Sequence, residues 1–291
     1  MTTLSYGMPD PEARKKIVRA PEPTLPSSVP ITSMLRFKDA RYARHASYEQ
    51  ARVLFSKVGP FLRSSRSIPS ETMSLEDFLS LVPPLPPEIE AADASSTEAV
   101  VLVCAGLPLD ALACVAQVAV MDSRRIYADL YELQPAGRAP SSFWLYWMIA
   151  HSGSRSQGVR PDDARLTYQP RFGGKFCVLT ASQALCWWIQ DKEVIQPGPE
   201  NGHVIDVSGT IGLSAAHLEK LAAGKKFTRQ TVWFGHDRRD ALVATLGVIS
   251  EQNSCDSCGS AYFMQTSALS IRPLTIQESL QRIPPFQAPG A

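Results

Sequence analysis

The side chains best suited to ligand chemistry lie between Gly224 and Arg239. This stretch, GKKFTRQTVWFGHDRR, carries five cations and one carboxylate among three aromatic rings. Ammonium and guanidinium groups contact phosphates without reading a base sequence, while a ring such as Phe227 or Trp233 can stack on a base or join the core. The candidate phosphate ligands here are Lys225, Lys226, Arg229, Arg238 and Arg239.

A second basic set lies towards the N-terminus. Residues 1–66 carry a net charge of +7, whereas residues 67–100 carry −7 and contain no Lys or Arg. This separation indicates either a solvated basic face followed by an acidic linker or an anion-binding surface. The total charge of +1 argues against coating of nucleic acid by charge alone. The candidates in this set are Arg36, Lys38, Arg41 and Arg44.

His236 offers a different chemistry. An imidazole needs a carboxylate to fix its tautomer before it can act as a general base, and Asp237 follows directly in the chain. Adjacent side chains seldom point the same way, so a surface turn is the simpler interpretation. The alternative is a small-molecule enzyme or ligand-binding domain with a cleft near His236 and Asp206. If the basic segments bind phosphates and the protein is not an enzyme, which is the interpretation we favour, we expect no catalytic residue and no cofactor.

Cys255 and Cys258 form a CxxC pair in the polar stretch NSCDSCGS. A structural zinc site needs four ligands, and the chain has no second CxxC and no closely spaced His pair. A zinc-stabilised interaction module is therefore a third hypothesis, beside a plain connection between two strands. The other four cysteines lie in apolar segments and are expected to act as small core residues: Cys104, Cys114, Cys177 and Cys186.

Helices are predicted from caps and apolar periodicity. Capping boxes are expected at Ser47–Gln50 and at Thr180–Gln183, and the helix that begins at Ser47 is expected to end at Gly59. A single N-cap is expected at Ser74. The apolar run Pro140–His151 is expected to be helical. Further helices are predicted at 74–81, 108–120, 214–223 and 275–282.

Strands are predicted from β-branched and aromatic runs between turn signals. They fall at 99–104, 126–133, 203–207, 229–234, 241–249 and 261–267, with a hairpin of 165–169 and 175–179 around Gly173–Gly174. Because several connections are hairpin-like, the fold class is predicted as α+β, with a mixed or antiparallel sheet and packed helices.

The prolines and charges suggest five segments. We predict an extended arm at 1–33, a basic helical segment at 34–82, a Pro-rich acidic linker at 83–97, an α+β core at 98–272 and an extended tail at 273–291. No apolar run is long enough to span a membrane, and the N-terminus lacks the apolar stretch of a secretory signal, so a cytoplasmic protein is expected.

Proline, alanine and serine account for 85 of the 291 residues, and both ends are rich in proline, as in PEPTLPSSVP and IPPFQAPGA. In this composition and its basic N-terminal third, the chain resembles the proline-alanine-serine-rich proteins of capsidless double-stranded RNA mycoviruses. That resemblance implies a viral structural protein associated with RNA. We therefore expect a non-enzymatic assembly protein that binds RNA or another polyanion and self-associates into a dimer or larger oligomer, with extended arms contacting its neighbours.

Overall fold

The computed structural model describes twelve ranges of the chain. They are residues 40–62, 73–87, 98–121, 124–135, 143–151, 160–163, 176–191, 204–237, 240–252, 258–264, 266 and 269–282. All of them belong to one compact unit, Ile31–Ala291. In these ranges no helix is long and apolar enough to cross a membrane. The predicted arm at 1–33 lies outside the described residues.

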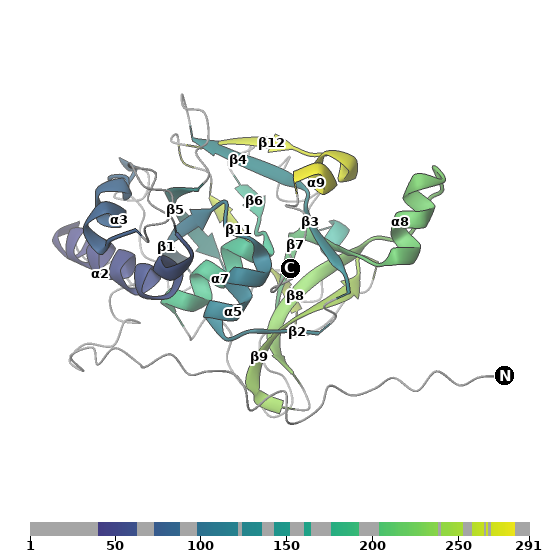
Figure 1. Cartoon of the computed structure of the whole chain (residues 1–291), viewed down its shortest axis with the longest axis horizontal. Helices are drawn as coiled ribbons and strands as arrows, with labels where there is room; N and C mark the ends of the chain where they lie inside the picture. Colours follow the sequence, from purple (N-terminus) through teal and green to yellow (C-terminus); the bar gives the residue numbers. More distant parts are fainter. Residues whose placement is uncertain are drawn as a thin grey trace. The chain divides into compact units, whose positions relative to one another are not determined.

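The fold is α+β, as predicted, and its strands form three sheets (Figure 1). The first sheet is antiparallel, in the order β1 (Glu98–Ala105), β5 (Trp144–His151), β11 (Tyr262–Met264) and β6 (Phe176–Val178). The smallest sheet pairs β12 (Leu269–Pro273) with β4 (Tyr131–Pro135).

The second sheet is mixed, and its path runs through five strands with a sixth attached. Antiparallel β7 (Val204–Leu213), β8 (Gln230–Asp237) and β9 (Asp240–Ser250) form its centre. Parallel β10 (Cys258–Ser260) and β2 (Ala119–Val120) add to β7 and β9, respectively, while β3 (Ile126–Asp129) pairs with the far end of β7. This arrangement places the start of β3 beside the end of β7.

Helix α7 (Ala181–Gln190) packs between the first two sheets. It contacts β1 of the first sheet and β7 and β8 of the second, and all of its residues except Ser182 are buried. Its predicted capping box is confirmed, because the Thr180 hydroxyl accepts from the Gln183 N–H while the Gln183 Oε1 accepts from the Thr180 N–H at 2.8 Å. The cap satisfies backbone donors that this buried helix could not expose to water.

Two glutamines satisfy backbone groups on the unpaired edge of β1. Gln190 at the end of α7 accepts from the Leu102 N–H at 3.1 Å and donates to the Leu102 carbonyl at 2.7 Å, as a neighbouring strand would. Gln50 donates to the Val100 carbonyl at 2.6 Å. Helices therefore protect an edge that would otherwise offer its hydrogen-bonding groups to another chain.

Helices α2 (Ala40–Val58) and α3 (Leu75–Leu81) pack on the first sheet and on α7 or each other. The predicted apolar stripe of α2 is confirmed at its centre, where Ala51, Leu54 and Val58 are fully buried. The predicted start at Ser47 is wrong, because the helix already runs from Ala40, and Gln50 reaches β1 instead of capping. The predicted helix over 74–81 and its Ser74 cap are confirmed, since Ser74 Oγ accepts from the Asp77 N–H.

The predicted helix over Pro140–His151 is wrong. Its described part, Trp144–His151, is strand β5, which lies between β1 and β11. Leu145 to His151 are all buried, so the run shows no alternation of apolar and polar residues. An apolar run buried on both faces carries no periodicity that separates strand from helix, and its aromatic content suits a strand.

Three smaller boundaries also differ from the predictions. Helix α5 (Leu109–Ala116) ends at Gln117, which takes a left-handed φ of 58°, and the end of the predicted helix is β2. The single strand expected at 126–133 is divided into β3 and β4 by Leu130. Only β6 of the expected hairpin at 165–179 lies among the described residues. Helices α8 (Ala215–Ala222) and α9 (Ile276–Arg282) confirm the last two helix predictions.

Three of the four cysteines expected in the core are buried, namely Cys104, Cys177 and Cys186. Burial raises the pKa of the Cys104 thiol far above its usual range and that of Cys186 to about 12, so both are protonated at neutral pH. Cys114 is an exception, because its position on α5 exposes it to solvent.

Candidate polyanion-binding site

Helix α8 fixes the direction in which the basic segment after it leaves the fold. Ser214 and His217 form its capping box, because the Ser214 N–H donates to His217 Nδ1 at 3.3 Å and the His217 N–H donates to Ser214 Oγ at 3.4 Å. Gly224 ends the helix with a φ of 64°, a conformation that favours glycine. The Lys225 N–H then donates to the Lys220 carbonyl at 2.8 Å. The turn therefore holds Lys225 beside the last turn of α8.

The two aromatic rings considered for base stacking have partners within the fold. Phe227 stacks on His217, with ring centroids 5.1 Å apart and planes 22° apart, and packs against a small apolar cluster that includes Ile211. Trp233 lies over Gly247 of β9, where an added Cβ would collide with the indole. Both residues are half-buried, and only Phe227 lies beside the basic residues Lys225 and Lys226 in the segment after α8.

Five cations gather around α8 and the start of β8, and we call them the α8 patch: Arg125, Lys220, Lys225, Lys226 and Arg229. All are exposed except Arg125, which is half-buried and donates to the Gln230 side chain next to Arg229. The pKa of His217 is lowered by burial and then by the charges of Arg125 and Lys220, which places both cations near its ring. The imidazole is therefore neutral at pH 7, and the positive charge of the patch comes from Lys and Arg.

The exposed cations of the α8 patch form no ion pair within the described part of the chain, although two carboxylates, Asp162 and Glu251, line the same groove as Lys226 and Arg229. The ion pairs there involve other residues, and Lys220, Lys225, Lys226 and Arg229 take part in none of them. A lysine or arginine that forms no ion pair can contact an external anion without first breaking an internal pair.

An open groove of about 380 Å³ lies beside the patch. Its walls combine two cations, one aromatic residue, two uncharged polar residues and two carboxylates. The lining residues are Asp162, Lys226, Phe227, Thr228, Arg229, Glu251 and Gln252. The Glu251 N–H donates to the Arg229 carbonyl at 3.2 Å, which ties the turn after β9 to the start of β8. The groove can therefore present positive, negative, polar and aromatic groups to one ligand.

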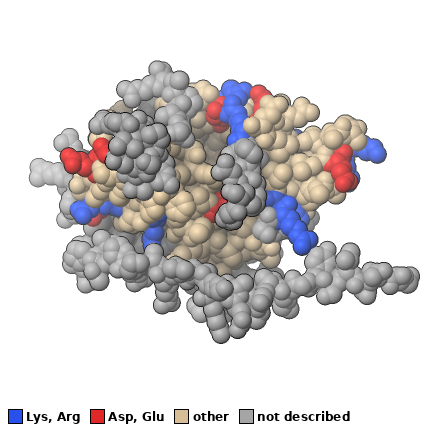
Figure 2. Space-filling model, in the orientation of Figure 1, with Lys and Arg blue, Asp and Glu red and all other residues tan. Residues whose placement is uncertain are grey.

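Within the described residues, the helix that carries part of the N-terminal basic set lies apart from the α8 patch. Helix α2, which carries Arg41 and Arg44, packs against α3, α5, α7 and β1, and it lies far from α8 in Figure 1. On the face in Figure 2, the described Lys and Arg side chains form separate groups, several with Asp or Glu beside them. Four predicted ligands, Arg36, Lys38, Arg238 and Arg239, and the side chains of Arg41 and Arg44 lie outside the described residues.

Sequence reasoning missed Arg125, Lys220 and the acidic wall of the groove. Arg125 reaches the patch because β3 pairs with β7, with Ile126 opposite Leu213 at the entry to α8. No spacing along the chain signals that pairing. Lys220 could have been found from the helix that ends at Gly224, since a residue in its last turn must lie near the segment that follows.

The structure separates the two residues proposed for an enzymatic cleft. Asp206 pairs with Trp233 and accepts hydrogen bonds from Thr231 at 3.1 Å and Ser260 at 2.8 Å. His236 lies an odd number of residues from both Trp233 and Thr231 on β8, so its ring points to the opposite face, where it meets Trp188 of α7. A carboxylate and an imidazole on opposite faces of a sheet cannot form one acid–base pair.

The two cysteines proposed as zinc ligands lie largely outside the described residues, so the zinc hypothesis stays untested. Cys255 and the side chain of Cys258 are not among them, although the backbone of Cys258 starts β10 and the strand predicted after it is present. Among the described side chains, no group of three or more His, Cys, Asp or Glu is arranged to hold a metal ion.

Comparison with known proteins adds no relative. No protein-family model matches the chain, and neither a curated protein nor a solved structure matches it significantly.

Proposed function

We propose that this protein is a non-enzymatic structural protein that binds RNA through the α8 patch. The observation that carries the proposal is the gathering of four exposed cations, Lys220, Lys225, Lys226 and Arg229, without an ion-pair partner among the described residues. A viral assembly role rests on the compositional resemblance described above.

The setting of the patch favours a contact surface over a structural role. Helix α8 stands out from the sheets in Figure 1, and none of its residues is buried. Helix α8 and the segment that follows it supply the four exposed cations, and the backbone around them is fixed by the capping box and by the bond from Lys225 to Lys220. Fixed, unpaired cations bind phosphates with little loss of side-chain partners, and they release counterions from the nucleic acid when they do so.

A salt titration tests the proposal directly. Binding of the full chain to a single-stranded homopolymeric RNA is measured at several salt concentrations, for the native protein and for Lys225→Ala/Lys226→Ala/Arg229→Ala. If three phosphate contacts are lost, the slope of log K against log salt falls in magnitude by about 2 and the affinity at low salt drops about tenfold or more.

Two controls make the result specific to position and charge. Lys225→Arg/Lys226→Arg keeps the charge and is expected to bind almost normally. Lys57→Ala removes an exposed lysine of α2, remote from the patch, and is compared with Lys226→Ala as the matched single change. Equal losses from both single changes, or native binding by the triple variant, would show that the α8 patch is not the binding surface.

Self-association is the second half of the proposal. We infer that the arm at 1–33 and the part of the predicted tail at 273–291 that follows α9 contact neighbouring copies, because prolines prevent these ends from forming a packed core of their own. Light scattering of the full chain at increasing concentration is expected to show a dimer or larger closed oligomer. A monomer at every concentration, with or without RNA, contradicts this half and leaves the patch to be judged by the titration.

A further inference from the structure

The groove beside the α8 patch contains groups that a surface for phosphate alone would not need. Lys226 and Arg229 suit a phosphate, but Asp162 and Glu251 repel one. Carboxylates accept hydrogen bonds from hydroxyl and amino groups, and the Thr228 and Gln252 side chains add further polar contacts. This mixture matches a ligand that carries negative charge at one end and hydrogen-bond donors at the other.

A nucleotide has that distribution of groups. Its phosphate is anionic, its ribose offers hydroxyl donors, and its base offers amino or imino donors and a flat face. The groove volume of about 380 Å³ lies at the low end of the range of small-ligand sites, which suits one nucleotide. Phe227 supplies an aromatic surface in the same groove.

The walls of the groove are held in place before a ligand arrives. The stack on His217 and the packing on the Ile211 cluster fix Phe227. The bond from the Glu251 N–H to the Arg229 carbonyl fixes the backbones of an acid and a base side by side, and Glu251 is only 7% exposed. Asp162 is half-buried in the separate short segment 160–163. A preformed site loses less conformational entropy on binding than a flexible one.

Building on the proposed RNA binding, we propose that this groove is a subsite for one unpaired ribonucleotide of a single strand. Lys226 and Arg229 contact its phosphate, and Asp162 and Glu251 accept hydrogen bonds from its ribose hydroxyl or base. The 2′-hydroxyl is the donor that distinguishes RNA from DNA, so these carboxylates favour RNA.

The sign of a charge change separates this subsite from a simple cationic surface. On a simple surface, neutralising a carboxylate strengthens binding to every polyanion, because a repulsive charge is removed. In the subsite, the same change replaces one carboxylate oxygen by an NH2 donor and leaves only a weaker, neutral acceptor, so it weakens RNA binding by about threefold to tenfold, the range for one hydrogen bond. DNA of the same base sequence and inorganic polyphosphate are expected to gain affinity or remain unchanged.

The experiment measures binding of the full chain to single-stranded RNA, to single-stranded DNA and to inorganic polyphosphate. The proteins are the native chain, Asp162→Asn, Glu251→Gln and the triple variant of the α8 patch, and thermal unfolding checks each fold. Asp162→Asn lies on a half-exposed side chain and keeps the test valid if Glu251→Gln does not fold. A lower ratio of RNA to DNA affinity in Asp162→Asn, with an unchanged salt slope, supports the subsite.

Two results would overturn the subsite, and only the second would also overturn the proposed RNA binding. If the triple variant loses binding but RNA, DNA and polyphosphate bind alike and Asp162→Asn strengthens all three, the subsite is wrong and the proposed function stands. If the native chain binds none of the three polyanions at low salt, the subsite and the proposed function fail together.

Discussion

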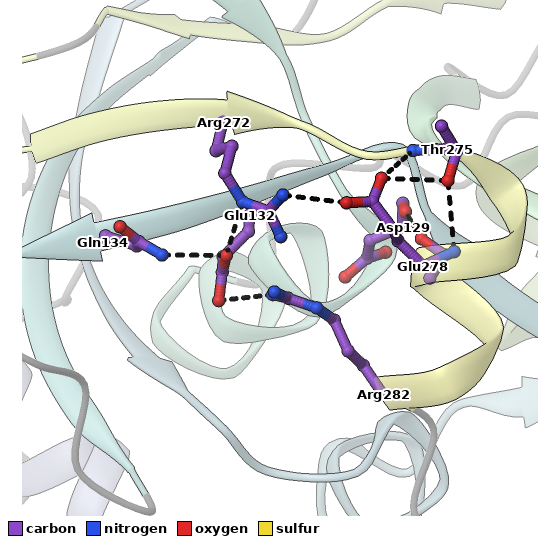
Figure 3. A network of polar contacts seen from close by, with 8 residues as sticks. Asp129, Glu132, Gln134, Arg272, Thr275, Glu278 and Arg282 are labelled. Carbon is purple, nitrogen blue, oxygen red and sulfur yellow. Dashed lines mark hydrogen bonds and ion pairs between the residues drawn. The ribbon is translucent and has the colours of Figure 1, made fainter.

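Two regions of the molecule use the same residue types in opposite ways. Around α9, four charged residues form a chain of three ion pairs, in the order Glu278, Arg272, Glu132 and Arg282 (Figure 3). Arg272 reaches Glu132 at 3.2 Å and Glu278 at 2.9 Å, and Arg282 also pairs with Glu132. In the α8 patch, by contrast, the exposed cations have no such partner within the described ranges.

The secondary structure explains the difference. Arg272 of β12 lies opposite Glu132 of β4 in the strand register, so the sheet itself brings the two charges together. Glu278 accepts from the Thr275 N–H at 2.8 Å and Thr275 Oγ1 accepts from the Glu278 N–H, which places Glu278 at the start of α9 and within reach of Arg272. No strand register supplies a carboxylate to Lys225 or Lys226. Paired charges therefore brace α9, while unpaired charges remain for a ligand.

Asp129 extends this comparison, because it is a carboxyl that forms no ion pair among the described residues. It is on β3, where Oδ1 accepts from Thr210 Oγ1 at 2.5 Å, and its backbone carbonyl accepts from Ser279 of α9. Burial raises its pKa to about 6, and the Thr210 hydrogen bond opposes that shift only in part. The fold therefore favours the neutral acid.

The largest expected effect on stability concerns Asp129→Asn. Because the folded pKa is raised from 3.8 to about 6, the contribution of Asp129 is full below pH 4 and is lost as the pH rises through 6. The loss is at most about 3 kcal/mol, and less where water reaches the half-buried carboxyl. The asparagine variant is expected to show a much flatter stability between pH 4 and 7, measured by denaturant unfolding at each pH.

The ion pairs around α9 provide the internal reference for that measurement. The pKa of Glu278 is lowered to about 2, by hydrogen bonds from Thr275 and Arg272, so its contribution is present above pH 4.5 and is lost only as the pH falls through 2. Between pH 4.5 and 7 this pair does not change. The lowered pKa of His217 reduces stability as the pH falls over the same range, so the native protein is compared with Asp129→Asn at each pH. If the native protein gains no stability relative to Asp129→Asn as the pH falls from 7 to 5, the assignment to Asp129 is wrong.

The next effect breaks the paired side of the comparison. Glu132→Ala leaves Arg272 and Arg282 without their shared acceptor and also removes the partner of the Gln134 side chain. Since Glu132 is only 19% exposed, we expect a loss of about 1–2 kcal/mol in the free energy of unfolding. RNA affinity is expected to stay native, because the network does not contribute to the α8 patch. Chemical denaturation and a binding titration on the same sample check both.

Local signals predicted much of this architecture, whereas contacts distant in sequence did not follow from them. The caps at Ser74 and Thr180 were predictable because the interacting groups lie three residues apart. The strand at Trp144–His151 was not predictable, because burial on both faces of β5 removes the alternation of apolar and polar residues that marks a strand. The capping box assigned to Gln50 shows the same limit, since its partner Val100 lies 50 residues away.

The candidate site divides in the same way. Lys225, Lys226 and Arg229 were predicted because they are close in sequence, and the structure keeps them together. Arg125 and the carboxylates Asp162 and Glu251 join them through the pairing of β3 with β7, the placement of residues 160–163 and the turn after β9. Those arrangements depend on tertiary packing, which no local pattern encodes.

The smallest expected effect tests the unpaired side of the comparison. Arg229→Ala removes an exposed side chain whose backbone carbonyl still accepts from the Glu251 N–H, so the fold keeps that contact. We expect the free energy of unfolding to change by less than about 0.5 kcal/mol, while RNA affinity falls. Arg272→Ala is the matched arginine change, and it is expected to destabilise the protein without affecting RNA. If Arg229→Ala destabilised the fold as much as Arg272→Ala does, the cation at 229 would be structural, and the distinction between the two regions would be wrong.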